Sequence, residues 1–258
     1  MMKSIARLFD ASSLRAFAMI AVLAVIWGYF HLATGQTFLK PQNLSNLMTQ
    51  MSVTGIIAVG MLMLIVSANI DLSVGSVLGL AGGIAAYTLT NLGYPIPVAI
   101  ALALLAGIAI GVFQGVLTAK AGIPAFIVTL GGLLAWRGAV KWQLGGNTVP
   151  IADDTFKMIG QGNIPAWVGW VLAGFAVAFV IAMAIRSQRA IKEYGLGEGS
   201  IVAALLKSLI PIVAILIFIW VMNSYQGVPI PVLIFVGVAL IGSFLMSSTT
   251  FGRYLYAI

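Results

Sequence analysis

This sequence contains few charged residues. Of its 258 residues only 7% are charged, whereas 61% are hydrophobic and the mean hydropathy is +1.11. A chain of this length with so few polar side chains cannot bury its apolar surface in a water-soluble core. Membrane lipid is therefore its solvent, and we expect a membrane protein.

Cysteine is absent altogether, and the chain has a single histidine, His31. The lack of cysteine excludes disulfides, thiolate metal sites and cysteine nucleophiles. No Walker A pattern, zincin motif or nucleophile elbow occurs in the sequence. We therefore expect neither an enzyme nor a bound metal or cofactor, and we interpret His31 as a side chain at the membrane interface.

Basic residues outnumber acidic ones by 13 to 6, and the pI is about 9.9. They form no basic patch with interleaved aromatics, which argues against nucleic acid as a partner. If the N-terminus is cytoplasmic, the inner segments hold Lys3, Arg7, Arg15, Lys120, Arg186, Arg189, Lys192, Lys207 and Arg253. The outer loops then hold Lys40 and Lys157. This asymmetry satisfies the positive-inside rule and places both termini in the cytoplasm.

Apolar runs of about 20 residues, the length that crosses a bilayer as a helix, recur along the chain. They predict an all-α, polytopic bundle with spans at 16–33, 51–68, 72–91, 96–117, 123–142, 165–185, 205–222 and 229–247. We expect one transmembrane domain over residues 1–258, with a cytoplasmic N-terminus at 1–15. A periplasmic loop at 143–164 and a cytoplasmic loop at 186–204 are the longer extramembrane segments.

A polar interruption at residues 67–75 separates two long apolar runs and contains Asn69, Asp71 and Ser73. One interpretation is structural: Asp71 caps a helix that begins at Leu72 by accepting otherwise orphaned backbone N–H groups. The other is a broken helix whose polar groups line a solute pathway, the setting in which non-helical backbone is tolerated at membrane depth. Both readings stay open, as does the choice between a tight turn and a re-entrant segment.

Small residues and one amide stand out inside the spans. Glycines recur at every fourth position in two series, at Gly75, Gly79, Gly83, Gly107, Gly111 and Gly115. This spacing lets helix backbones approach closely in lipid, so we interpret the glycines as helix-packing positions. Gln114 lies in mid-membrane and must find a hydrogen-bond partner in the bundle or in a water-filled cavity.

Several stretches resemble the signature of monosaccharide permeases of ATP-binding-cassette (ABC) importers. They are residues 54–61, 70–76, 123–132 with the Arg-Gly pair at 137–138, 227–232 and 250–258. Within that family the resemblance is greatest to the xylose branch, through the extended segment after Arg186 and the stretch that starts at Asn223. It runs from about residue 40 to the last residue.

The resemblance implies a permease subunit that carries a monosaccharide, with xylose favoured, across the bacterial inner membrane. It also implies a permease homodimer, separate cytoplasmic ATP-binding subunits and a periplasmic sugar-binding protein. On this reading Asn69, Asp71, Ser73 and Gln114 are the candidate substrate-path residues. Members of this family continue past the position of Ile258 into the helix that docks on the ATPase, so we expect this chain to be truncated before that helix.

Two alternatives of other classes are kept. An ion-coupled secondary transporter has the same gross composition, but proton relays use several intramembrane ionisable groups and Asp71 is nearly alone. A non-transporting membrane fragment is the second alternative. The sequence leaves open which sugar is carried.

Overall fold

The computed structural model describes residues 11–193 and 201–257. Within these ranges the regular structure is helical, apart from one antiparallel β-bridge between Asn163 and Pro229. The prediction of an all-α fold is confirmed. Most of the predicted N-terminal segment 1–15 and part of the loop at 186–204 lie outside the described residues.

Each predicted span coincides with a long helix. These helices are α2 (Ala11–Ala33), α3 (Pro41–Val66), α4 (Val74–Thr90), α5 (Ile96–Ala119), α6 (Ala125–Gln143), α8 (Ala166–Glu193), α9 (Ile201–Asn223) and α10 (Ile230–Ser248). By length and composition, five described stretches could cross a membrane: Pro41–Val66, Ile96–Ala119, Ala166–Ile191, Ala204–Asn223 and Ile230–Ser248. The prediction of a polytopic membrane bundle is therefore confirmed.

Some helix boundaries differ from the predicted span boundaries. The second span begins at Pro41 rather than at residue 51, because its polar first turns continue the same helical backbone. The third begins at Val74 rather than Leu72. The loop at 143–164 contains a short helix, α7 (Asp154–Gln161), whose first turn is capped by Asp153 Oδ1 accepting the Phe156 N–H at 2.9 Å. A second short helix, α11 (Thr250–Ala257), follows α10.

The chain divides into two compact units. The first combines Asn163–Pro229 with the chain up to Met48, and within it α8 packs along α9. Ile164 donates its N–H to Val228 O at 2.9 Å, which joins the segment before α8 to the segment after α9.

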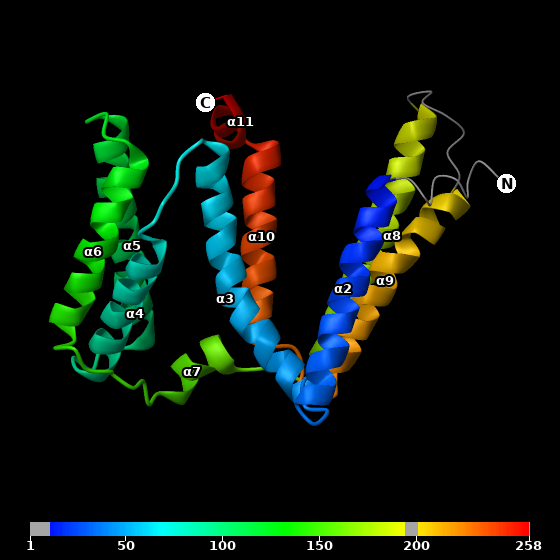
Figure 1. Cartoon of the computed structure of the whole chain (residues 1–258), viewed down its shortest axis with the longest axis horizontal. Helices are drawn as coiled ribbons and strands as arrows, with labels where there is room; N and C mark the ends of the chain where they lie inside the picture. Colours follow the sequence, from blue (N-terminus) through cyan, green and yellow to red (C-terminus); the bar gives the residue numbers. More distant parts are fainter. Residues whose placement is uncertain (1–10, 194–200, 258) are drawn as a thin grey trace. The chain divides into compact units, whose positions relative to one another are not determined.

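The second unit comprises Thr49–Gly162 and Ile230–Ile258. Here α4 packs against both α5 and α6, and these three helices form the group labelled together in Figure 1. α10 contacts α7 and α11. α3 approaches α10 closely, since a Cβ at Gly55 would lie 2.6 Å from the Phe235 ring and one at Gly242 would lie 2.6 Å from Val59 Cγ1.

Candidate functional site

The polar interruption forms a true break between α3 and α4. Ala68 donates its N–H to Ile65 O, and Asn69 donates to Leu64 O, each at 3.0 Å. This pair of bonds closes the helix end as a Schellman motif, with Ala68 in the left-handed position at φ +57°. Glycine usually occupies that position, because a Cβ there is strained. The chain then runs non-helically until Val74.

Asn69 is oriented by the turn that precedes it. Its Nδ2 donates to Ser67 O at 2.8 Å and lies 3.2 Å from Ser67 Oγ. Both amide protons are therefore directed back toward α3. The carbonyl oxygen Oδ1 of Asn69 makes no hydrogen bond within the described chain.

Asp71 folds back on the start of α4. Its Oδ1 accepts from both the backbone N–H and the hydroxyl of Ser73, each at 2.7 Å. The interpretation of Asp71 as the cap of a helix at Leu72 is wrong: α4 begins at Val74 with Ser73 as its N-cap, and Asp71 accepts from Ser73. One carboxylate oxygen is fixed in this way, whereas no hydrogen bond among the described residues uses Oδ2.

Ser73 and Gln114 form the buried part of the site. The Ser73 side chain is 0% exposed and that of Gln114 7%. Ser73 Oγ lies 2.7 Å from Asp71 Oδ1 but 3.2 Å from Gln114 Oε1, so its single proton goes to the anionic acceptor. Gln114 Nε2 then donates to Ser73 Oγ at 3.0 Å. The result is a directed hydrogen-bond chain from Gln114 through Ser73 to Asp71.

α6 holds the break in place from the other side. Thr129 Oγ1 lies 2.9 Å from Ala125 O in its own helix and 3.2 Å from Ile70 O in the break. Ser76 donates its hydroxyl to Leu133 O at 2.9 Å. The non-helical segment is therefore anchored to a neighbouring helix as well as to its own ends.

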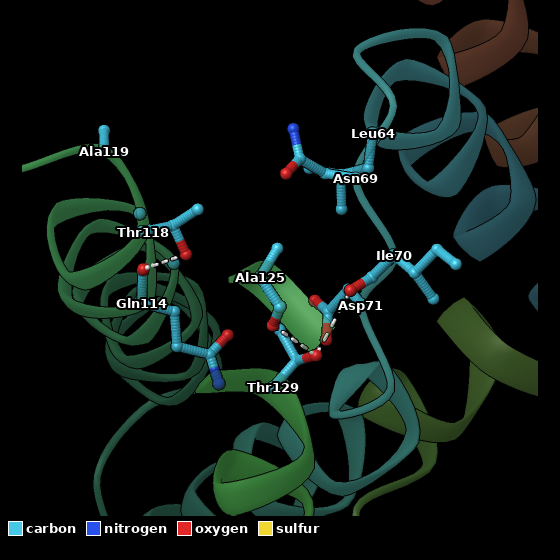
Figure 2. Close-up of a pocket in the computed structure, with 11 residues that line it drawn as sticks. Leu64, Asn69, Ile70, Asp71, Gln114, Thr118, Ala119, Ala125 and Thr129 are labelled. Atoms are coloured by element: carbon cyan, nitrogen blue, oxygen red, sulfur yellow. Dashed lines mark hydrogen bonds between the residues drawn. The ribbon is translucent and has the colours of Figure 1, made fainter. Parts of the chain in front are cut away.

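A cavity of about 280 Å³ opens beside the break, and we call it the break pocket. It is lined by Leu64, Asn69, Ile70, Asp71, Gly111, Gln114, Gly115, Thr118, Ala119, Ala125 and Thr129. In Figure 2 the lining residues surround one space and come from the end of α3, the break, α5 and α6. Apolar walls with a few convergent polar groups are typical of small-molecule sites.

The predicted path residues meet here. Asn69, Asp71 and Gln114 line the break pocket, and Ser73 lies behind Asp71, bonded to it. Among the lining residues Asp71 is the only ionisable one, and none is basic. The pocket is therefore weakly anionic and otherwise neutral.

The glycines of the two series differ in what surrounds them. A Cβ at Gly83 would lie 2.9 Å from Val140 Cγ2 of α6, so this glycine permits a close approach of α4 and α6. At Gly75, Gly79, Gly107, Gly111 and Gly115 a Cβ would meet nothing within 4 Å in the described chain. Gly111 and Gly115 line the break pocket. Whether the open glycines pack against another helix stays a prediction.

Sequence reasoning missed Thr118, Thr129 and Gly132. A Cβ at Gly132 would lie 3.0 Å from Trp136 Nε1 and 3.3 Å from Ser73 Cβ, and it would collide with Gln114 Nε2. Gly132 thus leaves the space that the Gln114 amide fills. Thr129 and Gly132 fall in the stretch 123–132 that carries the resemblance, and this resemblance could have identified them. No sequence signal indicates Thr118.

Comparison with known proteins places the chain in a family. The family model described as "Branched-chain amino acid transport system / permease component" matches residues 43–258. The chain belongs to this family. This membership confirms the prediction that the chain is a transport permease rather than an enzyme.

Curated members of this permease family include sugar permeases. The chain is 38% identical over 246 residues to the xylose transport system permease protein of Haemophilus influenzae, covering 95% of this chain and 66% of that protein. The corresponding protein of Escherichia coli K12 is 37% identical over 95% of this chain, and the match covers 63% of that protein. The ribose import permease protein of H. influenzae is 34% identical over 197 residues, 73% of this chain and 59% of that protein.

This member of the permease family spans just under two thirds of the length of the xylose relatives it matches. No solved structure matches it. With its apolar helices and these relatives, it is a multi-pass inner-membrane protein.

Proposed function

We propose that this chain is the membrane-spanning permease component of an ABC importer that carries a monosaccharide of the xylose type. The observation that carries the proposal is the similarity to two xylose permeases over 95% of the chain. The break pocket supports it independently, because it is a cavity beside non-helical backbone within a bundle of apolar helices.

The electrostatics of the pocket favour a neutral sugar over an amino acid. An amino acid brings a carboxylate that needs a cationic or strongly donating partner in a desolvated site. Asp71 could pair with the ammonium group of an amino acid but would repel its carboxylate, and no lining residue is basic. A neutral polyol meets no such penalty, so the family's descriptive name does not set the substrate of this chain.

Asn69, Asp71, Ser73 and Gln114 form the path on this proposal, in two different ways. Asn69 and Asp71 present oxygens to the solute, whereas Ser73 and Gln114 hold Asp71 in position. The sugar moves without covalent chemistry, and ATP hydrolysis belongs to separate cytoplasmic subunits. A homodimer of permeases encloses the path, and a periplasmic sugar-binding protein delivers the solute to the outer loops.

The orientation follows from the basic residues. On the proposal, residues 1–258 are one permease domain with both termini in the cytoplasm. Residues 1–15 and 186–204 are cytoplasmic, and residues 143–164, which include α7, are periplasmic.

The test is uptake of labelled xylose in bacteria that express the importer containing this chain. Asp71→Ala should abolish uptake while leaving the amount of protein in the membrane unchanged. Glu193→Gln is the matched control, because Glu193 is an exposed acid at the end of α8 and does not line the break pocket. Unchanged uptake in Asp71→Ala would defeat the assignment of the path.

Energy coupling separates this proposal from a secondary transporter. Uptake by an ABC importer should stop on ATP depletion and persist when the proton gradient is collapsed with ATP maintained. The opposite pattern would identify ion coupling instead.

A further inference from the structure

The threonine hydroxyl protons and the Asn69 amide protons around the break pocket share one property: they are already used inside the protein. The Thr118 hydroxyl donates to Gln114 O at 3.0 Å, and that of Thr129 is taken by Ala125 O or Ile70 O. Both Asn69 amide protons are directed at Ser67. Each of these side chains is thus left with an oxygen that can only accept a hydrogen bond.

Asp71 adds the strongest acceptor. Its Oδ1 is occupied by Ser73, and no hydrogen bond within the described chain uses Oδ2. A bond to an ionised acceptor is roughly twice as strong as one between neutral groups. The oxygen that dominates the pocket is therefore one that needs a donor from the solute.

Two kinds of donor lie near the pocket: the Gln114 amide and two backbone N–H groups. Gln114 Nε2 is bonded to Ser73 and lies against Gly132, which does not line the pocket. The backbone N–H groups of Ile70 and Asp71 make no hydrogen bond inside the described part of the chain and remain as neutral donors. Apart from the second Gln114 amide proton, which has no acceptor within the described chain, side-chain recognition in the pocket thus runs from solute proton to protein oxygen.

We infer that the break pocket selects its solute by hydroxyl donation: a polyol is held through O–H groups that donate to Asp71 Oδ2 and to the oxygens of Asn69, Thr118 and Thr129. This inference rests on the proposed function and adds the determinant of specificity to it. A bare cation would also suit oxygen ligands, but a cavity of about 280 Å³ with walls at Leu64 and Ala125 is far too roomy and apolar for an ion.

Fluorinated sugars test the direction of these bonds, since fluorine replaces a hydroxyl at similar size but cannot donate. The ligands are D-xylose and its derivatives in which each hydroxyl in turn is replaced by fluorine. Binding to this chain in lipid nanodiscs is measured by saturation-transfer NMR titration. At one or more positions the fluorinated sugar should bind about tenfold more weakly than xylose, the loss expected for one charge-assisted bond.

Asp71→Asn gives the sharper test, because it replaces one acceptor oxygen by an NH₂ donor of the same shape. Oδ1 can still accept from Ser73, so the NH₂ group faces the pocket. The variant should bind xylose more weakly and lose most of the discrimination against the fluorinated sugar. Glu193→Gln should bind all ligands as the unmodified chain does. Thr118→Val, which removes one neutral oxygen, should weaken xylose binding by a few-fold and gives a second reading if Asp71→Asn does not fold.

The outcomes are distinct. If xylose binds and every fluorinated derivative binds equally well, selection by hydroxyl donation is overturned, while the proposed importer function stands on the uptake assay. If xylose gives no saturable signal with the unmodified chain, the pocket is not a polyol site and the inference is likewise overturned. If uptake fails but xylose binds with the expected discrimination, the inference stands and the proposed transport function falls.

Discussion

At the scale of single residues, the site depends on positions where a side chain is absent or strained. Gly132 has no side chain, and the Gln114 amide fills the space a Cβ would take. Ala68 does have a Cβ, and it adopts φ +57° at the end of α3. Local backbone strain is sustained by the surrounding structure, which here closes the Schellman motif and anchors the break to α6.

Gly132→Ala should disrupt the hydrogen-bond chain that holds Asp71. The added methyl would displace Gln114, so we expect a loss of stability of about 1–3 kcal/mol and reduced xylose uptake. The apparent Tm in detergent and the uptake rate measure the two effects. Gly131→Ala is the control, because a Cβ at Gly131 meets nothing within 4 Å. Equal behaviour of the two variants would contradict the packing described for Gln114.

Ala68→Gly should stabilise the protein. Relief of the left-handed alanine is worth about 0.5–1 kcal/mol after allowing for the greater flexibility of glycine in the unfolded chain. The same substitution at Ala58, an exposed position inside α3, should instead destabilise by about 1 kcal/mol. Thermal unfolding of the two variants should therefore shift in opposite directions; a lower Tm for Ala68→Gly would argue against the strained turn.

At the scale of helices, α4 and α6 approach each other through Gly83. Without a hydrophobic drive between helices in lipid, close packing of this kind supplies much of the association. Since α4 begins directly after the break and α6 bonds to the break through Thr129, the α4–α6 contact also fixes the geometry of the pocket.

Gly83→Ala should separate these two helices. Its Cβ would lie 2.9 Å from Val140 Cγ2, and we expect a cost of about 1–3 kcal/mol in unfolding experiments in detergent. Val140→Ala in the same chain removes the clashing methyl and should restore part of that loss. Gly82→Ala, where a Cβ meets nothing within 4 Å, should be neutral or slightly stabilising. A double variant no better than Gly83→Ala would show that another contact is responsible.

At the scale of the whole molecule, the orientation is the feature that the helices alone do not define. The chain has no cysteine, so single introduced cysteines can be labelled without background. Thr155 in α7 and Ser187 near the end of α8 are both exposed and suit this purpose.

With both termini in the cytoplasm, Thr155→Cys should react with a membrane-impermeant maleimide in cells whose outer membrane has been permeabilised. Ser187→Cys should react only after the inner membrane is disrupted. Mass shift of the purified protein measures the labelling, and the reverse pattern would invert the proposed topology.

Composition and periodicity alone determined much of this protein. The scarcity of charge fixed lipid as the solvent, and apolar runs of span length located each long helix, because a backbone in lipid must satisfy its hydrogen bonds within helices. The start of α3 at Pro41, well before the predicted residue 51, is the largest departure. An acid within a polar interruption identified Asp71 and its neighbours as candidate site residues. These are local properties of the chain, so they can be read without knowing what lies beside it.

Tertiary structure alone decided which side chains from distant parts of the sequence contact one another. Gln114 lies 41 positions from Ser73, and only the packing of α5 against the start of α4 makes them partners. Thr118, Thr129 and Gly132 acquire their roles in the same way, from neighbours distant in sequence. Which oxygens remain open to a solute depends on where every nearby proton is already bonded, and that is set by distances between elements rather than by the order of residues.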